Sequence, residues 1–443
     1  MDNQKETTIY DARELGMAKT FVFGLQHMFA MFGATVLVPA ITGLSVSATL
    51  LFAGAGTLLF HAITKMKVPA FLGSSFAFLA AYLTIAPNGE KDLLPYACFG
   101  VALAGLAYLV LAAFFKAYGA KKVMRFFPPV VTGPIIISIG LCLAGWALSC
   151  CQANWGIALV AVITIIICNI FGKGMIKIVP ILIGIIVSYT VAAVAGIVDF
   201  TGVSAAPWIG LPFKMSDTVF SLAGNADTSL LLTAAVTAIP ITLATMMEHI
   251  GDVAAIGSTV GRNFIADPGL HRTLMGDGLA TSVAALFGAP ANTTYSENTG
   301  VLALTKVYDP LVVRVAACLA ILMSFCPKFA ALISAMPTAT MGGVSLILYG
   351  MISAIGVRNV VESKVDFTKS RNVIIAGLIL VLAVGIKYGL PGESIVLSLG
   401  SFTVAMSGLA TAALVGIITN ALLPGNEYEF DDGLNDSATL GRY

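Results

Sequence analysis

The chain has 443 residues, of which 58% are hydrophobic and 11% charged, and its formal net charge is +1 at pH 7. Soluble domains carry about 25% charged residues, so most of this surface does not face water, and the charge balance gives no reason to expect a nucleic-acid partner. The composition excludes a soluble protein and predicts an integral membrane protein surrounded by the lipid bilayer.

Apolar runs follow one another along almost the whole chain, after a polar segment that ends at about Lys19 and indicates no cleavable signal peptide. A membrane-spanning helix needs about 20 mostly apolar residues. The runs predict an all-α polytopic membrane protein of about 14 transmembrane spans. They lie near residues 20–44, 46–64, 69–86, 93–115, 127–149, 155–171, 178–198, 229–250, 271–289, 294–305, 311–326, 337–356, 372–389 and 394–422.

The basic residues predict the orientation of these spans. With a cytoplasmic N-terminus, 20 of the 24 Lys and Arg residues fall inside, and only Lys91, Lys214, Lys328 and Lys387 fall outside. Cytoplasmic loops of membrane proteins carry an excess of Lys and Arg. We therefore expect both termini to lie in the cytoplasm.

The third and tenth runs, 69–86 and 294–305, are short and broken by small or polar residues. Non-helical backbone at membrane depth is tolerated only where protein or a water-filled cavity satisfies its hydrogen bonds. Small residues also pack helices together in membranes, and this alternative stays open for the glycine and serines of the third run. The breaks favour a polar binding site near the bilayer midplane.

Two halves of the chain resemble each other weakly. Gln26-His27 matches Glu248-His249 at an offset of 222 residues, and the same offset carries Ser75 onto Glu297. The matches indicate two repeats of seven spans. Because seven is odd, the second repeat is inverted relative to the first. Inverted repeats with paired broken helices are typical of secondary transporters.

Three acidic residues, Glu248, Asp252 and Glu297, fall within predicted spans, where ionisable groups are costly and are functional hypotheses by default. Glu248 and Asp252 are four residues apart and share one helix face. Burial and mutual repulsion both favour a protonated carboxyl, which suits coupling to a proton gradient. Alternatively, Asp252 is solvated at the cytoplasmic mouth or pairs with Arg262.

Several motifs resemble the nucleobase–ascorbate transporter family over about residues 17–422. The family signature is matched by Glu297-Asn298-Thr299-Gly300 with Thr305-Lys306, and its first-span Gln-His pair by Gln26-His27. Stretches that resemble the bacterial uracil permeases of this family are Gly73-Ser74-Ser75-Phe76-Ala77-Phe78, Glu248-His249-Ile250-Gly251 and residues 343–350.

The resemblance implies a core domain that packs against a gate domain, with short antiparallel strands in spans 3 and 10. The core comprises residues 20–115 (spans 1–4) and 229–326 (spans 8–11), and the gate 116–198 (spans 5–7) and 327–422 (spans 12–14). Residues 199–228 form an extracytoplasmic loop, and residues 1–19 and 423–443 are cytoplasmic. The family precedent is a homodimer packed through the gate domain, in the bacterial inner membrane.

The resemblance also implies the activity, which is import of uracil by proton symport with alternating access, without a cofactor or a metal. Glu248 and Glu297 would bind the edges of the ring, and Asp252 would join them in proton coupling. Contacts with the ring would come from Phe76, Ser296, Ala34, Tyr295, Tyr349 and Ser75. Support for the site would come from Gln26, His27, His249 and Asn298, although a buried histidine is as often a packing element.

One residue departs from the uracil-permease pattern. Those permeases carry a second histidine after Glu-His-Ile-Gly, where this chain has Asp252, as xanthine permeases do. A xanthine or urate permease, or Na⁺ coupling, is therefore the alternative within transport. A membrane-embedded enzyme is disfavoured, because the sequence has no nucleophile–base constellation. A passive channel is disfavoured because buried carboxylates in broken helices suit binding better than permeation.

Overall fold

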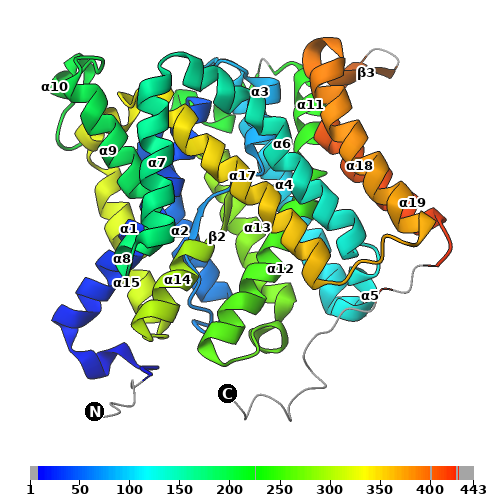
Figure 1. The fold of residues 1–443 in the computed structure, drawn as a ribbon, viewed down its shortest axis with the longest axis horizontal. Helices are drawn as coiled ribbons and strands as arrows, with labels where there is room; N and C mark the ends of the chain where they lie inside the picture. Colours follow the sequence, from blue (N-terminus) through cyan, green and yellow to red (C-terminus); the bar gives the residue numbers. More distant parts are fainter. Residues whose placement is uncertain (1–7, 225, 400–401, 426–427, 429–443) are drawn as a thin grey trace.

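The computed structural model describes residues 8–224, 226–399, 402–425 and 428, and shows helices that run roughly side by side (Figure 1). The predicted tail 423–443 and the first seven residues of the predicted segment 1–19 fall largely outside this range. The helices of the first half are η1 (Ala12–Leu15), α1 (Met17–Thr42), α2 (Val46–Ile63), α3 (Leu79–Ile85), α4 (Leu94–Tyr118), α5 (Ala120–Met124), α6 (Pro129–Gln152), α7 (Trp155–Phe171), α8 (Met175–Ile178), α9 (Pro180–Val194) and α10 (Thr201–Ala205).

The second half begins with two short turns, η2 (Met215–Asp217) and η3 (Val219–Leu222). Its helices are α11 (Thr228–Ala238), α12 (Ile241–Val260), η4 (Ile265–Gly269), α13 (Leu270–Leu286), α14 (Ser296–Thr305), α15 (Pro310–Ser324), α16 (Pro327–Ser334), α17 (Thr338–Glu362), α18 (Ser370–Gly389), η5 (Pro391–Glu393) and α19 (Gly408–Leu422). The strands are β1 (Leu72–Ser74), β2 (Asn292–Thr294), β3 (Ser394–Leu399) and β4 (Phe402–Ser407).

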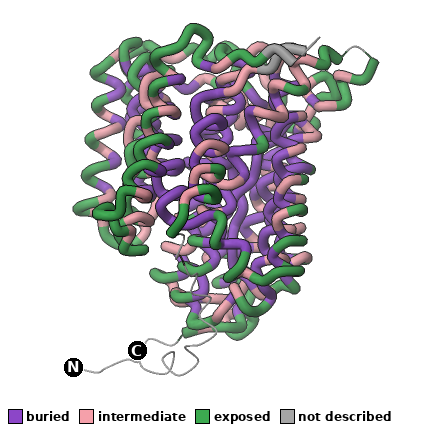
Figure 2. Tube along the Cα trace, turned by 90° about the vertical axis from the view of Figure 1, so that its right-hand side faces the viewer, coloured by how far each residue is buried: buried purple, intermediate pink, exposed green. Residues whose placement is uncertain are grey.

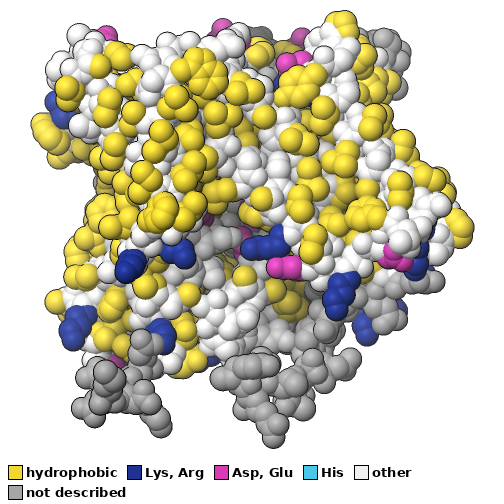
Figure 3. Space-filling model, viewed as in Figure 1, with side chains coloured by type: hydrophobic (Ala, Val, Ile, Leu, Met, Phe, Trp, Pro, Cys, Tyr) yellow, Lys and Arg dark blue, Asp and Glu magenta, His cyan; other side chains and the backbone are white. Residues whose placement is uncertain are grey.

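The described helices are those of a multi-pass membrane protein. By length and composition, 7 can cross a bilayer, or up to 8 if the bent pair α15 and α16 counts as one span. Buried residues concentrate along the central helices (Figure 2). Apolar side chains cover most of the face in Figure 3, while Lys and Arg gather in its lower part, towards the chain ends of Figure 1. The count of 14 spans stays a prediction.

Strands β1 and β2 pair with each other in the antiparallel sense, with Gly73 opposite Thr293. Each is followed along the chain by a short helix, α3 or α14. The strands can approach because Gly73 has no side chain: a Cβ there would lie 2.5 Å from the ring of Tyr295 and 2.7 Å from Oγ1 of Thr35. Strand β1 lies within the third predicted span, whereas β2 mostly precedes the tenth.

The prediction of one apolar span over residues 394–422 is wrong, because a pair of strands that the sequence did not predict replaces its first half in this mostly helical fold. Residues Ser394–Leu399 and Phe402–Ser407 form an antiparallel hairpin, and only Gly408–Leu422 is helical. The run contains four β-branched residues, Ile395, Val396, Thr403 and Val404, and residues of this kind are enriched in strands. Ser407 then caps the helix, because its side chain accepts a hydrogen bond from the backbone N–H of Ala410.

The helices pack in two groups. In the first group, α4 contacts α13 and α11, α2 contacts α13 and α15, and α15 contacts α1. In the second group, α17 contacts α6 and α7, α18 contacts α6 and α19, and α7 contacts α9. Fewer contacts join the groups, chiefly those of α11 with β4, and also those of α1 with α9 and of α12 with α6. The groups can therefore be treated as two bodies that face each other.

Helices α4 and α13 cross at two glycines. A Cβ on Gly105 would lie 2.3 Å from Oγ of Ser282, and a Cβ on Gly278 would lie 2.4 Å from Cβ of Tyr108. The backbones thus meet without intervening side chains, as at close helix crossings in membranes.

We expect Gly105→Ala to destabilise the protein by about 1–3 kcal/mol, because overpacking forces the helices apart. The measurement is the midpoint of thermal unfolding of the purified protein in detergent. The matched control is Gly377→Ala in α18, where a Cβ meets nothing within 4 Å. Equal midpoints for the two variants would contradict the tight crossing.

Candidate functional site

The helix that carries Glu248 begins inside the bundle. Helix α11 ends at Ala238, and α12 starts at Ile241 after Ile239 and Pro240. Proline lacks the backbone N–H that a continuous helix needs, so the break at this point follows from the sequence. Glu248 then lies two turns into α12, half-buried, and its side chain lines a cavity.

The second carboxylate lies in the first turn of α14. Strand β2 ends at Thr294, Tyr295 precedes the helix, and Glu297 follows Ser296. An acidic side chain is stabilised at a helix N-terminus, where backbone N–H groups are unpaired. Tyr295 fixes this turn against the other break, because its hydroxyl donates to the carbonyl oxygen of Ser74 over 2.8 Å.

A cavity of about 450 Å³ lies between the two groups of helices. Of the predicted site residues, it brings together Phe76, Glu248, Tyr295, Ser296 and Glu297. The opposite wall comes from α6, α9 and α17 and is largely apolar. Its residues include Ile136, Ile139, Ile181, Leu348, Met351, Ile352 and Ile355.

Three predicted contact residues are not part of the described lining. Ala34 on α1 is 2% exposed, and Tyr349 on α17 is 1% exposed. Ser75 is also buried, and its backbone N–H donates to the carbonyl oxygen of Ala291 over 2.8 Å. These residues support the walls of the cavity in this conformation. The lining also includes four polar residues that were not among the predicted site residues, Asn169, Lys177, Thr293 and Thr294.

Asp252 joins α12 to the start of α14. Its Oδ2 accepts a hydrogen bond from the hydroxyl of Thr294, and its Oδ1 accepts one from the hydroxyl of Ser296, each over 2.7 Å. The side chain is 8% exposed, and the guanidinium of Arg262 lies instead over the ring of Tyr10. The alternative of a solvated Asp252, or of one paired with Arg262, is wrong because α12 continues to Val260 and keeps this residue inside.

Two of the four predicted support residues, Asn298 and His27, form a link between α14 and α1. The side-chain amide of Asn298 donates to the backbone carbonyl of His27 over 3.0 Å and lies 3.1 Å from Nδ1 of the same histidine. The side-chain oxygen of Gln26 is buried, without a hydrogen-bond partner among the described residues. The link holds the first turns of α14 in place.

One buried acidic residue escaped the sequence analysis. Asp277 on α13 is fully buried, and its Oδ2 lies 3.0 Å from Nδ1 of His249, which is fully buried too. The sequence could have identified Asp277, because it is an acidic residue inside the predicted span 271–289, between two glycines. The structure therefore gives His249 a charged neighbour and directs it away from the cavity-lining residues.

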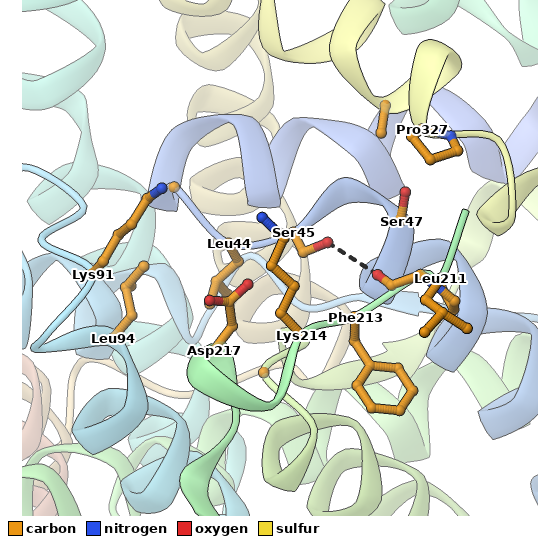
Figure 4. A pocket seen from close by; sticks show the side chains of 14 residues that line it. Leu44, Ser45, Ser47, Lys91, Leu94, Leu211, Phe213, Lys214, Asp217 and Pro327 are labelled. Atoms are coloured by element: carbon orange, nitrogen blue, oxygen red, sulfur yellow. Dashed lines mark hydrogen bonds between the residues drawn. The ribbon is translucent and has the colours of Figure 1, made fainter. Parts of the chain in front are cut away.

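A second cavity, of about 280 Å³, contains none of the predicted site residues (Figure 4). It is lined by the loop between α1 and α2 and by residues 211–214 and 217, and Oγ of Ser45 donates to the carbonyl oxygen of Pro212 over 3.2 Å. Two of the four lysines predicted to lie outside, Lys91 and Lys214, border it. Without a convergent pair of buried carboxylates, this cavity is not our candidate site.

Comparisons with known proteins identify relatives along nearly the whole chain. The sequence model of the permease family matches residues 18–392. The uracil permease of Bacillus caldolyticus is 42% identical over 411 residues, which cover 90% of this chain and 91% of the relative. That of Bacillus subtilis is 41% identical, covering 93% and 94%, and that of Escherichia coli is 37% identical, covering 90% of each.

Solved structures with little sequence similarity share the fold. The transmembrane domain of the cyanobacterial bicarbonate transporter BicA aligns with a TM-score of 0.60 at 14% identity, covering 94% of this chain and all of that domain. The murine anion transporter solute carrier 26 family member A9, in its inward-facing state, aligns with a TM-score of 0.65 at 9% identity, covering 95% of this chain and 73% of that one.

We expect Asp252→Ala to lower the thermal unfolding midpoint without any ligand, because the buried hydroxyl of Thr294 loses its acceptor at about 1–3 kcal/mol, and the more exposed hydroxyl of Ser296 loses its acceptor as well. Asp252→Asn keeps one acceptor oxygen and should cost less. The measurement is thermal unfolding in detergent, with the exposed Asp92→Ala as the control. Midpoints for both Asp252 variants that match the control would mean that this carboxylate does not hold Thr294 and Ser296.

Proposed function

This chain belongs to the permease family, and from that premise we propose that it is a secondary active transporter that imports uracil by proton symport across the bacterial inner membrane. As a member of this family it is a transporter and not an enzyme. The observation that carries the proposal is one cavity lined by two carboxylates, Glu248 and Glu297, beside the paired strands.

The chemistry of the cavity fits a small planar amide-like ring. Uracil presents two N–H donors and two carbonyl acceptors. Carboxylates suit its N–H groups because charge-assisted hydrogen bonds are the stronger ones, and the backbone near Phe76 and Ser296 supplies further partners. The volume of about 450 Å³ falls within the range of about 300–1,000 Å³ that is usual for small-molecule pockets. The apolar wall would pack against the faces of the ring.

Proton coupling is supported by the crowding of carboxylates on one side of the cavity. Glu248 and Asp252 share one face of α12, and Glu297 follows the serine that donates to Asp252. Like charges at such close quarters cannot all stay ionised, and the protons then belong to the group rather than to one residue. We propose that Glu248, Asp252 and Glu297 together exchange the coupled proton.

The runner-up within transport is a purine such as xanthine or urate. Asp252 is the residue that suggests a purine, and its two carboxylate oxygens accept hydrogen bonds from the hydroxyls of Thr294 and Ser296. Asp252 is also absent from the described lining of the cavity. A direct contact between Asp252 and the ligand is therefore disfavoured, so Asp252 gives no reason to prefer a purine; Na⁺ is the alternative coupling ion.

Alternating access is supported by the division of the helices into two groups. We propose that the group with α1, α2, α4 and α11–α15 is the core, that the group with α6–α9 and α17–α19 is the gate, and that they rock against each other. The basic side chains in the lower part of Figure 3 support cytoplasmic termini. A homodimer through the gate domain is proposed on the family precedent.

We expect purified protein in liposomes to take up labelled uracil when an inward proton gradient is imposed. Excess xanthine should not compete, and Glu248→Gln should abolish uptake because an amide cannot exchange the proton. The measurement is initial uptake with the gradient present and collapsed. Competition by xanthine would make the substrate a purine. Uptake that needs a sodium gradient, or survives loss of Glu248, would rule out proton coupling through this residue.

A second prediction concerns the contact of α1 with α9. A Cβ on Gly33 would lie 3.0 Å from the backbone nitrogen of Leu182 and 3.2 Å from Cγ2 of Ile181. Gly33→Val would therefore wedge the two bodies apart and disfavour the present conformation. We expect a several-fold lower maximal uptake rate, measured in liposomes, because the overpacking costs about 1–3 kcal/mol in one conformer only.

The control for this wedge is Gly385→Val in α18, where a Cβ has open space. It should leave uptake unchanged. If Gly33→Val also transports at the normal rate, α1 and α9 do not separate or close during the cycle, and the division between core and gate would have to be drawn elsewhere.

A further inference from the structure

Helix α12 has polar residues on two faces. Glu248 and Asp252 face the cavity side, where Asp252 accepts hydrogen bonds from Thr294 and Ser296. Thr245 and His249, also four residues apart, form the second polar face. This second face points to α4 and α13, away from the proposed ligand.

Both residues of the second face have a polar partner there. The hydroxyl of Tyr108 on α4 donates to Oγ1 of Thr245 over 2.6 Å. Nδ1 of His249 lies 3.0 Å from Oδ2 of Asp277 on α13, and both side chains have no exposed surface. Within the described part of the chain, neither the ring nitrogens of His249 nor the carboxylate oxygens of Asp277 form a hydrogen bond of good geometry, so the 3.0 Å approach of Nδ1 to Oδ2 is a close polar contact rather than an aligned hydrogen bond. Each is therefore the polar partner on which the other depends.

The two partners are carried by one rigid unit. Helices α4 and α13 cross where Gly278, the neighbour of Asp277, meets Tyr108, with no room for a Cβ. The ring of Phe60 on α2 closes the site from another side, with its centroid 6.1 Å from that of His249. The polar face of α12 is thus held by a tightly packed block that does not touch the cavity.

A buried polar or charged pair resists separation. Removing one partner leaves the other without compensation in a low-dielectric interior, at several kcal/mol, and no water in the hydrocarbon core replaces it. Rotating α12 about its axis would separate His249 from Asp277. Since successive helix residues point about 100° apart, at 3.6 residues per turn, the same rotation would turn Glu248 out of the cavity.

We infer that His249 is a positioning residue, which through Asp277 fixes the rotation of α12 and so holds Glu248 towards the ligand. The inference rests on the proposed function, because it assigns Glu248 to ligand binding. His249 itself does not touch the ligand. The alternative is that the pair only stabilises the fold, in which case its loss would change stability but not affinity.

The test is equilibrium binding of labelled uracil to the purified protein in detergent, together with the KM and kcat of uptake into liposomes. We expect His249→Gln to raise both Kd and KM at least about tenfold, since small misplacements of a binding group carry penalties of this order or larger. The matched control is His271→Gln, at the start of the neighbouring helix, which should bind as the wild type does.

A double variant in which the two residues are exchanged distinguishes a positioning role of the pair from a non-specific loss of structure. His249→Asp combined with Asp277→His restores a pair of the same kind with its members reversed, and it should recover most of the lost affinity. Asp277→Asn keeps an acceptor for the histidine and should give an intermediate Kd. If either single variant fails to give a monodisperse protein, the exchange variant still decides, because it is rescued only when the two residues act as a pair.

Three outcomes would overturn the inference. A His249→Gln protein with a normal Kd and KM but a lower unfolding midpoint would show a structural role only. An exchange variant that folds but binds no better than the single variants would show that the pair does not position Glu248. If the wild type itself binds no uracil, the proposed function fails first, and this inference fails with it.

Discussion

The structure depends on one constraint, which is that backbone polar groups inside a bilayer must find partners within the protein. The third and tenth predicted spans are interrupted, and the pairing of β1 with β2 lets each break satisfy the other. Threonine hydroxyls form hydrogen bonds with the outer edges of the strand pair. The backbone N–H of Leu72 donates to Oγ1 of Thr57, and the carbonyl oxygen of Asn292 accepts from Oγ1 of Thr281, each over 2.9 Å. The cavity can therefore lie beside non-helical backbone whose strand groups are paired with each other and with neighbouring hydroxyls.

The acidic residues of the site are arranged around this pair of strands. Because β2 ends where α14 begins, Glu297 lies in the first turn of a helix, beside the cavity. Asp252 reaches across from α12 to the same junction, and Asn298 ties the following turn to α1. The result is asymmetric, since the carboxylates lie on one body while the other contributes a mainly apolar wall.

The sequence predicted the parts of this arrangement that charge makes conspicuous. Glu248, Asp252 and Glu297 stand out because acidic residues are rare in membrane spans. Asp277 was not predicted although it is more deeply buried than these three, because it belongs to none of the motifs that resemble the family. The partners of Asp252 could not be predicted, since they depend on how α12 packs against β2. The β3–β4 hairpin could not be predicted from hydrophobicity, because an apolar run of that length is equally compatible with a helix.

The gathering of Glu248, Asp252 and Glu297 on α12 and α14 has an electrical consequence. If these helices move as one body, its net charge is set by how many of the three carboxylates are ionised. A membrane potential acts on such a body in proportion to that charge, at about 2.3 kcal/mol per elementary charge and 100 mV. In the proposed symport, the voltage across the membrane would then act differently on the protonated and the deprotonated carrier, and the potential as well as the concentration of protons would set the direction of the proposed cycle.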